Sequence, residues 1–256
     1  MRKRTIGGCT LYHGDCFSIL PKLDIAADAI ISDPPYGITA CEWDILPPLG
    51  RFWEMVERKT KPTANIVLFG CGRFAVDLIN SKYVWYRYDL IWQKNNKVGF
   101  LNANKMPMRN HESILVFGRP GFCKEATYNP QKTPGGRAGI RRPPADIKHK
   151  KSCVYRDVPY TDSVSDGTLH PCSILSFKSD KNNNNGLHPT LKPLALMKWL
   201  IKTYTNEGDM VIDPFMGSGT TGVACAKLGH RFIGIEREET YYGTALKRIQ
   251  EIVGSR

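Results

Sequence analysis

Short apolar runs alternate with stretches of helical spacing along most of the chain. Residues 29–31 and 210–212 are apolar throughout, which is typical of strands buried on both faces of a sheet. Similar runs predict further strands at residues 9–15, 65–70, 83–92, 113–117 and 231–236. Apolar positions three or four apart predict helices at residues 51–60, 73–80, 194–203, 221–228 and 239–253. This alternation favours an α/β fold with a mostly parallel sheet and helices on both faces.

Residues 119–187 interrupt this alternation. The segment is rich in Pro, Gly, Asn and charge, and it carries 12 Lys/Arg against 6 Asp/Glu. Tyrosines lie among its most crowded basic residues, which are Arg137, Arg141, Arg142, Lys148, Lys150 and Lys151. Two interpretations stay open at this point. The segment is either a disordered, solvated insertion, or a loop-rich surface whose cations neutralise nucleic-acid phosphates and whose polar tips read base edges.

The composition of the whole chain narrows the class of protein. The 256 residues carry a net charge of +12, which indicates either simple solubility or a polyanionic partner. No apolar run approaches the roughly 18 residues of a membrane span, and no apolar stretch follows the basic start, so a cytoplasmic protein is expected. The eight cysteines contain no C-x-x-C pair. That spacing favours reduced thiols and predicts neither disulfides nor a metal site.

The first strand-end motif begins at Asp33. The strand over residues 29–31 must end there because Pro34 and Pro35 cannot donate to a sheet ladder. The carboxyl ends of strands are where open α/β sheets bind their ligands. Tyr36 follows on a turn that the two prolines stiffen. A carboxylate, backbone carbonyls and an aromatic ring in this order suit a flat ring that carries an amine.

A second motif has the same order of strand, Asp213, proline and turn. Here the turn is rich in glycine and opens a helix. Glu236 ends the next strand about 20 residues later, where an acid can accept both hydroxyls of a ribose. A P-loop is disfavoured because no lysine precedes Thr220.

Two ligands remain for this turn. Gly217, Gly219 and Gly222 have the spacing G-x-G-x-x-G, so a dinucleotide is not excluded. The carboxylate of Asp213 argues against it, because it would repel a pyrophosphate. The same carboxylate suits a cationic ligand with a free amino group, and S-adenosylmethionine is such a ligand.

Together these residues resemble the amino-group DNA methyltransferases, which modify adenine N6 or cytosine N4, in the motif order of the β class. The matching segments are Asp33–Tyr36, His111-Glu112, His188–Pro193, Asp213–Thr221 and, after them, Glu236. The resemblance implies a circularly permuted, Rossmann-like fold of S-adenosylmethionine-dependent methyltransferases. It makes residues 1–118 the catalytic half, 119–187 a target-recognition insertion and 188–256 the cofactor-binding half of the same domain.

The order of the elements supports the permutation. One helix follows the strand that ends at Glu236, so the strand expected next in the sheet must be the amino-terminal one. That strand ends at Asp15, which the family pattern places near the adenine amine of the cofactor. On local grounds alone, Asp15 could equally cap the helix that follows it.

The resemblance implies catalytic roles for the tetrapeptide Asp33, Pro34, Pro35 and Tyr36. The target base leaves the DNA stack and enters a pocket. Asp33 and the carbonyl of Pro34 accept hydrogen bonds from the exocyclic amine, and Tyr36 stacks on the base. The transfer is then an in-line displacement without a covalent enzyme intermediate.

The resemblance also implies a set of residues that hold the cofactor. They are Asp15, Cys16, His188, Thr190, Lys192, Asp213, Phe215, Gly217, Ser218, Gly219, Thr220 and Glu236. Of these, His188 and Lys192 could instead only cap the helix that begins after Pro193. The six basic residues of the insertion named above are the expected DNA contacts.

The resemblance implies that the substrate is the N6 amine of adenine in double-stranded DNA, because in the family an aspartate at the first position of the tetrapeptide goes more often with adenine. The alternatives are cytosine N4, an RNA base or a protein amide, and a DNA-binding homologue that has lost catalysis. A second copy of the chain and a cognate restriction endonuclease are further candidate partners. The expected location is the cytoplasm of a prokaryotic cell or of a virus-infected host cell.

Overall fold

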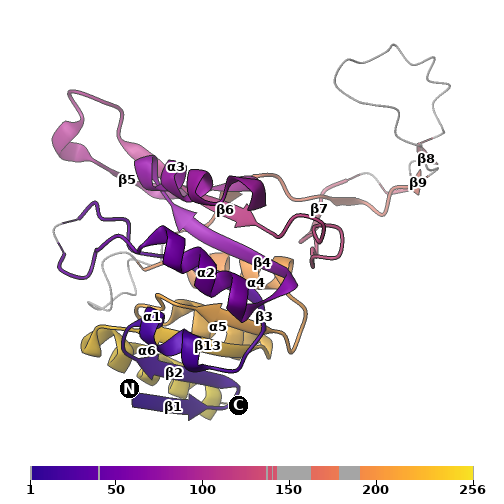
Figure 1. Ribbon diagram of the computed structural model, residues 1–256. Helices are drawn as coiled ribbons and strands as arrows, with labels where there is room; N and C mark the ends of the chain where they lie inside the picture. Colours follow the sequence, from indigo (N-terminus) through magenta and orange to yellow (C-terminus); the bar gives the residue numbers. More distant parts are fainter. Residues whose placement is uncertain are drawn as a thin grey trace. The chain divides into compact units, whose positions relative to one another are not determined.

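Nine strands in the described part of the chain form one central sheet (Figure 1). The computed structural model describes residues 2–39, 41–136, 138–139, 141–142, 163–178 and 191–255. The strands of the sheet are β1 (Arg2–Ile6), β2 (Cys9–His13), β3 (Ala27–Ser32), β4 (Thr60–Gly70), β5 (Tyr86–Val98), β6 (Arg109–Phe117), β11 (Ile174–Ser176), β12 (Met210–Asp213) and β13 (Arg231–Glu236). Their order is β1-β2-β13-β12-β3-β4-β6-β5-β11.

Helices cover both faces of this sheet, as the sequence predicts. They are α1 (Cys16–Ile19), α2 (Leu49–Lys59), α3 (Gly72–Ser81), α4 (Leu194–Tyr204), α5 (Thr220–Leu228) and α6 (Glu239–Gly254), with short 3-10 turns η1 (Leu20–Lys22), η2 (Tyr83–Trp85) and η3 (Phe100–Asn102). One core lies between the sheet and α4, α5 and α6, and a second lies between the sheet and α1, α2 and α3. In the described part of the chain, no helix is long and apolar enough to cross a membrane.

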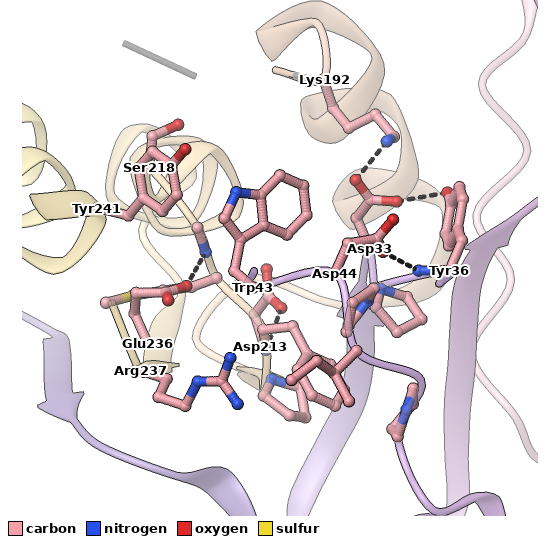
Figure 2. Close-up of a pocket in the computed structure, with 18 of the residues that line it drawn as sticks. Asp33, Tyr36, Trp43, Asp44, Lys192, Asp213, Ser218, Glu236, Arg237 and Tyr241 are labelled. Atoms are coloured by element: carbon pink, nitrogen blue, oxygen red, sulfur yellow. Dashed lines mark hydrogen bonds and ion pairs between the residues drawn. The ribbon is translucent and has the colours of Figure 1, made fainter. Parts of the chain in front are cut away.

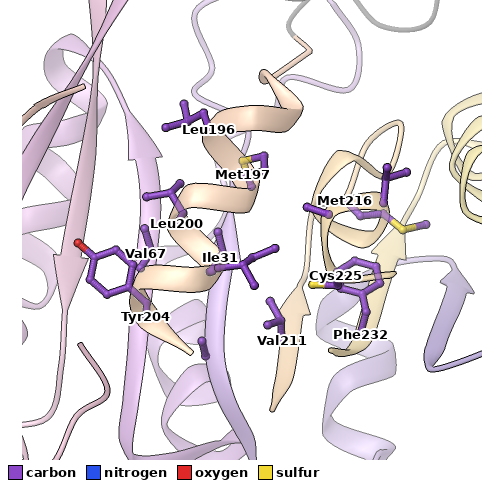
Figure 3. Close-up of a cluster of buried hydrophobic side chains, with 14 of the residues drawn as sticks. Ile31, Val67, Leu196, Met197, Leu200, Tyr204, Val211, Met216, Cys225 and Phe232 are labelled. Atoms are coloured by element: carbon purple, nitrogen blue, oxygen red, sulfur yellow. The ribbon is translucent and has the colours of Figure 1, made fainter. Parts of the chain in front are cut away.

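Successive residues of the central strands point into different cores. Ile31 packs with Leu200 of α4 in the first core (Figure 3), whereas Ile30 belongs to the second core. The same alternation separates Val211 from Ile212. A strand buried on both faces therefore has no polar positions, which is why the sequence shows continuous apolar runs.

The sheet directions bring several strand ends to one edge. The strands β2, β13, β12, β3 and β4 are parallel neighbours. β6 runs antiparallel between β4 and β5, so β5 again has the direction of β3. The carboxyl ends of β2, β3, β5, β12 and β13 consequently share one edge, which is the ligand-binding edge of such sheets.

The predicted permutation is present. β2 pairs in parallel with β13, with Cys9 opposite Phe232. The preceding strand β1 was not predicted, because its residues are mostly charged or polar and exposed. It pairs antiparallel with β2 from Arg2↔His13 to Ile6↔Cys9 at the outer edge of the sheet.

The structure divides the chain within the segment predicted as the insertion. The chain divides into one unit of residues 1–129 and 173–256 and a second unit of residues 130–172. Residues before and after the second unit belong to the main sheet unit, since the Asn129 N–H donates to the Thr203 carbonyl at 2.8 Å and β11 pairs with β5. The described residues of the second unit form two short antiparallel pairs, β7 (Thr133–Pro134) with β10 (Thr168–Leu169) and β8 (Arg141–Arg142) with β9 (Ser163–Val164).

The strand predicted over residues 83–92 is displaced towards its carboxyl end. Tyr83 begins the η2 turn, and β5 extends to Val98. The extension was not predicted because residues 94–97 are Lys and Asn, which do not alternate with apolar residues. The pairing with β6 shifts register between Gln93 and Val98, so this end of the hairpin is irregular.

Candidate active site

One cavity of about 650 Å³ opens at the carboxyl edge of the sheet and contains both strand-end motifs. Figure 2 shows Asp33 beside Tyr36 and Lys192 at one end, and Glu236 near Ser218 and Tyr241 at the other. We call these the catalytic end and the cofactor end. The indole of Trp43 lies between the two ends. The chain therefore brings together two motifs that are far apart in sequence, because β3 and β12 are neighbours in the sheet.

Asp33 follows β3 directly and is held from two sides. The Tyr36 hydroxyl donates to Asp33 Oδ1 at 2.5 Å, and Lys192 Nζ donates to Asp33 Oδ2. The Tyr36 ring packs on Phe74 of α3, with ring centroids 5.1 Å apart. Pro34 and Pro35 line the same cavity. All four residues of the predicted catalytic tetrapeptide therefore lie at one end of the site.

Lys192 is the centre of a buried charge cluster. Its Nζ contacts Asp33 and lies 3.3 Å from Glu112 Oε2, while Lys94 forms a second ion pair with Glu112. The Lys192 side chain is only 7% exposed. Acidic and basic groups thus alternate from Lys94 through Glu112 and Lys192 to Asp33.

This cluster shifts the proton affinity of its members. Burial raises the pKa of Asp33, and the nearby Glu112 adds to this shift while Lys192 opposes it. Burial disfavours the charged forms of Glu112 and Lys192 as well, but ion pairing outweighs it. The pKa of Glu112 is lowered by Lys192 and Lys94, and the pKa of Lys192 is raised by Asp33 and Glu112.

The structure places Lys192 beside Asp33, and the cofactor role expected from the sequence stays a prediction. Lys192 was placed with the residues that hold the cofactor, or as a helix cap. In the structure its ammonium contacts the carboxylate of Asp33, and the residue lines the cavity that also contains the cofactor end. His188 and Thr190, expected beside it, lie outside the described residues. The sequence could not place Lys192 because its two acidic partners are far away along the chain.

Asp44 fixes the turn that follows the catalytic tetrapeptide. Its Oδ1 accepts the backbone N–H groups of Tyr36 and Gly37 at 2.7 and 2.8 Å. Its Oδ2 accepts those of Ile38 and Thr39 at 2.9 and 2.7 Å. Burial works against the charge, but hydrogen bonds from the Thr39 side chain and from the backbone N–H groups outweigh it and lower the pKa of Asp44. Sequence reasoning missed this residue, since an aspartate in a loop has no local signal for such a role.

Glu236 shapes the glycine-rich turn at the cofactor end. The Gly217 N–H donates to Glu236 Oε2, and the Glu238 N–H donates to Glu236 Oε1, both at 2.8 Å. Burial raises the pKa of Glu236, while these backbone donors oppose the shift. A carboxylate has about four acceptor positions, which leaves capacity for the hydroxyls of a bound ribose.

Asp213 serves the fold as well as the cavity. Its Oδ1 accepts the Ser32 hydroxyl at 2.6 Å and the Phe215 N–H at 3.1 Å, and its Oδ2 accepts the Thr221 hydroxyl at 2.6 Å. The residue is 2% exposed. Burial raises the pKa of Asp213 to about 6, against the effect of its hydrogen bonds. The carboxylate expected to face a ligand is therefore largely engaged by the chain itself.

Replacing Asp213 by Asn tests this engagement. An acid with a higher pKa in the folded state binds more protons when folded, so its contribution to stability falls as pH rises from about 4 to 6. In Asp213→Asn the amide oxygen can still accept from Ser32 and Phe215, and the amide nitrogen can donate to Thr221. We expect the unfolding free energy of the variant, relative to wild type, to rise by roughly 2 kcal/mol between about pH 4 and pH 7. Urea unfolding at each pH measures it, and a difference that does not change with pH contradicts the expectation.

The remaining residues predicted for the cofactor divide into two groups. Those that line the cavity are Asp15, Cys16, Phe215, Gly217, Ser218 and Thr220. Asp15 occupies the position before α1 without a side-chain cap bond, and its Oδ2 accepts the Ser18 hydroxyl at 2.8 Å. Gly219 does not line the cavity. A Cβ at Gly219 would lie 2.7 Å from Ala245 Cβ, so this glycine allows α6 to approach the turn.

We expect Gly219→Ala to lose stability by two causes. The φ of 79° is strained for alanine, and the added Cβ would meet Ala245. Gly72→Ala is the matched control, because Gly72 has a φ of 55° and nothing within 4 Å of the added Cβ. The variant at Gly219 should cost about 1–3 kcal/mol more than the control, measured by urea unfolding. Equal losses would show that α6 adapts to the extra atom.

The basic residues expected to contact DNA cannot be placed at a site. Arg137, Lys148, Lys150 and Lys151 lie outside the described residues. Arg141 and Arg142 form β8 of the second unit, and only their backbone is described. Their predicted role stays a prediction.

Comparison with known proteins agrees with the geometry of the cavity. The sequence model of a family described as DNA methylase matches residues 27–247. The Type II methyltransferase M2.DpnII of Streptococcus pneumoniae is 52% identical over 267 residues, which cover 94% of this chain and 89% of the relative. The chain belongs to the DNA methylase family.

Two further comparisons extend over nearly the whole methylase. The DNA adenine methyltransferase YhdJ of Escherichia coli (strain K12) is 28% identical, with 94% of this chain and 82% of the relative covered. The crystal structure of an M1.HpyAVI–SAM complex has a TM-score of 0.63 at 27% identity, with 94% of this chain and 98% of that chain covered. The predicted family, fold class and S-adenosylmethionine-dependent methyltransferase activity on DNA are thereby confirmed.

The donor groups at the cofactor end fit S-adenosylmethionine. Four carboxyl groups line this part of the methylase cavity, from Asp15, Asp213, Glu236 and Glu238. They favour a sulfonium cation with an amino group and hydroxyl donors, and they disfavour a pyrophosphate. Trp43 and Tyr241 add aromatic surface, with ring centroids 6.3 Å apart in an edge-to-face arrangement. Neither aromatic residue was predicted, because each comes from a loop or helix with no motif of its own.

Proposed function

We propose that the methylase transfers the methyl group to the N6 amine of adenine in double-stranded DNA. The observation that carries the proposal is the position of Asp33 in the same cavity as the carboxyl groups around Glu236. The adenine specificity named for YhdJ supports the choice of base. Aspartate as the first residue of the catalytic tetrapeptide supports it as well.

The catalytic end supplies two acceptors for the amine. Asp33 keeps acceptor positions beside those used by Tyr36 and Lys192, and the Pro34 carbonyl has no neighbouring amide hydrogen from Pro35. Two hydrogen bonds from the amine to these oxygens orient the nitrogen lone pair away from them. S-adenosylmethionine, held at the cofactor end, would supply the methyl group that this nitrogen attacks. Most of the rate enhancement then comes from positioning.

The charge that develops on the nitrogen is stabilised by Asp33. A preorganised carboxylate in a site with little water stabilises positive charge strongly. Because burial raises the pKa of Asp33, the same carboxylate is suited to take the proton that the amine releases. Tyr36, held by Phe74, borders this position with its aromatic ring.

We also propose which residues hold the cofactor, which segment recognises the target sequence, and which partners and location the methylase has. Asp15, Cys16, Phe215, Gly217, Ser218, Thr220 and Glu236 would hold the cofactor. Residues 119–187, with the second unit at their centre, would recognise the target sequence. A homodimer and a cognate restriction endonuclease are proposed partners, the latter because the relative M2.DpnII is named a Type II methyltransferase. The proposed location is the cytoplasm of a prokaryotic or virus-infected cell.

Transfer of a tritiated methyl group to unmethylated genomic DNA tests the function. The DNA is digested afterwards and its nucleosides are separated. Label in N6-methyladenine is the expected result, and label in N4-methylcytosine would keep the mechanism and overturn the choice of base. Methyl transfer to heat-denatured DNA from the same source, compared with transfer to the native DNA, tests whether the substrate is double-stranded. Binding of the cofactor without label in any DNA would move the activity to RNA or protein, or leave a DNA-binding homologue without catalysis.

A further inference from the structure

The hairpin between β5 and β6 ends in exposed apolar side chains. We call residues 97–108 the hairpin tip. Phe100 and Leu101 of η3 are 80% and 95% exposed, which are the highest values for large hydrophobic side chains among the described residues. Met106 in the same tip is 59% exposed. Neither core of the sheet unit includes them. Apolar surface of this kind marks a contact with another molecule.

The charge around the tip identifies the kind of molecule. Residues 94–111 contain four Lys or Arg residues and no Asp or Glu. Lys97 and Lys105 are exposed, and the described residues provide neither of them with an ion pair. The same stretch contains five asparagines, whose amides both donate and accept hydrogen bonds. Cations, amides and exposed apolar groups together suit a polyanion with flat apolar faces, which is a nucleic acid.

The tip continues a wall of the cavity. Alternate residues of β5, namely Trp92, Lys94, Asn96 and Val98, line the cavity together with Arg109 and Glu112 of β6. The ion pair between Lys94 and Glu112 joins the two strands at this level. β5 has the direction of β3, so the hairpin projects from the edge of the sheet at which β3 ends (Figure 1).

We propose that the hairpin tip contacts the opened DNA stack beside the extruded base, with Phe100 and Leu101 against neighbouring bases and Lys97 and Lys105 on phosphates. The inference rests on the proposed function, because a base that enters the cavity leaves its position in the stack empty. Apolar side chains that enter base steps stabilise such an opening. This surface belongs to the sheet unit, and its residues lie outside the segment 119–187 predicted as the recognition insertion.

The double variant Phe100→Ala/Leu101→Ala tests the contact. Tyr83→Ala/Val84→Ala is the matched control, because these residues are 70% and 76% exposed and precede the opposite end of β5. Binding to fragments of unmethylated genomic DNA is measured by fluorescence anisotropy, and S-adenosylmethionine binding by calorimetry. We expect the test variant to lose about ten-fold or more in DNA affinity. Cofactor affinity should stay within about two-fold in both variants, and DNA affinity should be unchanged in the control.

A second variant tests the cations. Lys97→Gln/Lys105→Gln should reduce the slope of log affinity against log salt by about 2, since each phosphate contact contributes about 0.9. The inference is overturned if Phe100→Ala/Leu101→Ala binds DNA as tightly as the wild type does. It is also overturned if the control variant loses as much DNA affinity as the test variant. If the wild type binds DNA without methylating it and the variant loses that binding, the proposed function fails while the contact is supported.

Discussion

Replacing Asp33 by Asn is expected to lower kcat by about 10³-fold or more, with little change in the binding of S-adenosylmethionine. The carboxylate lies at the catalytic end of the cavity, where it contacts Tyr36 and Lys192. Asparagine keeps an oxygen for these contacts but has no negative charge for the developing cation. The cofactor end is formed by other residues, so calorimetry should give a cofactor Kd within about two-fold of wild type. Asp33→Ala should be equally inactive.

Asp89→Asn provides a matched control for this prediction. Asp89 also accepts a hydrogen bond from a tyrosine three residues away, Tyr86, at 3.1 Å, but at an exposed position that does not line the cavity. This variant should keep wild-type kcat. Methyl transfer by Asp33→Asn at a wild-type rate would remove Asp33 from catalysis. A large loss of cofactor affinity would instead give Asp33 a part in holding the cofactor.

Replacing Lys192 by Met is expected to shift the pH dependence of kcat. Lys192 opposes the rise in the pKa of Asp33, whereas burial and Glu112 promote it. Without the ammonium, the pKa of Asp33 rises further and less of the ionised form is present at neutral pH. The acidic limb of the profile should therefore move to higher pH. At an assay pH below the apparent pKa of that limb, kcat should fall by about ten-fold for each pH unit between the two.

The control for Lys192 is its neighbour in the charge cluster. Lys94→Met removes an ammonium that pairs with Glu112 and has no recorded contact with Asp33, so its profile should move much less. Breaking a buried ion pair costs about 3–5 kcal/mol, and the stability of Lys192→Met is therefore followed by thermal unfolding over the same pH range. A profile that only scales down, without moving along the pH axis, contradicts the expected effect on Asp33.

Much of the fold follows from local features of the sequence. Asp33 and Asp213 could be placed at strand ends because a proline follows each of them and a double-faced apolar strand precedes them. The strand ending at Glu236 was predicted with its observed bounds. The neighbour relation of β2 and β13 followed from the order of elements. These features depend on short stretches of chain, which is why the sequence is sufficient for them.

The contacts that tune the site could not be predicted in the same way. Lys192 reaches Asp33 across 159 residues of sequence, and no local pattern records that meeting. Asp44 binds four backbone N–H groups, which carry no side-chain signal. Gly219 was predicted to hold the cofactor because glycine suits a close approach, and no local pattern shows that α6 approaches it as well. The sequence therefore shows which residues lie near the site more readily than it shows which groups each of them contacts.

The pairing of β2 with β13 also determines when the cofactor end can form during synthesis. β2, which ends at His13, leaves the ribosome long before its parallel neighbour β13, which begins at Arg231, has been made. At typical elongation rates β2 waits roughly 10–45 s for that partner. Over this interval the edge of β2 that β13 will occupy has no neighbour, and Glu236 has not yet been made to fix the Gly217 turn. A nascent chain stalled before β13 should therefore be unable to retain S-adenosylmethionine, even with the complete catalytic tetrapeptide already folded.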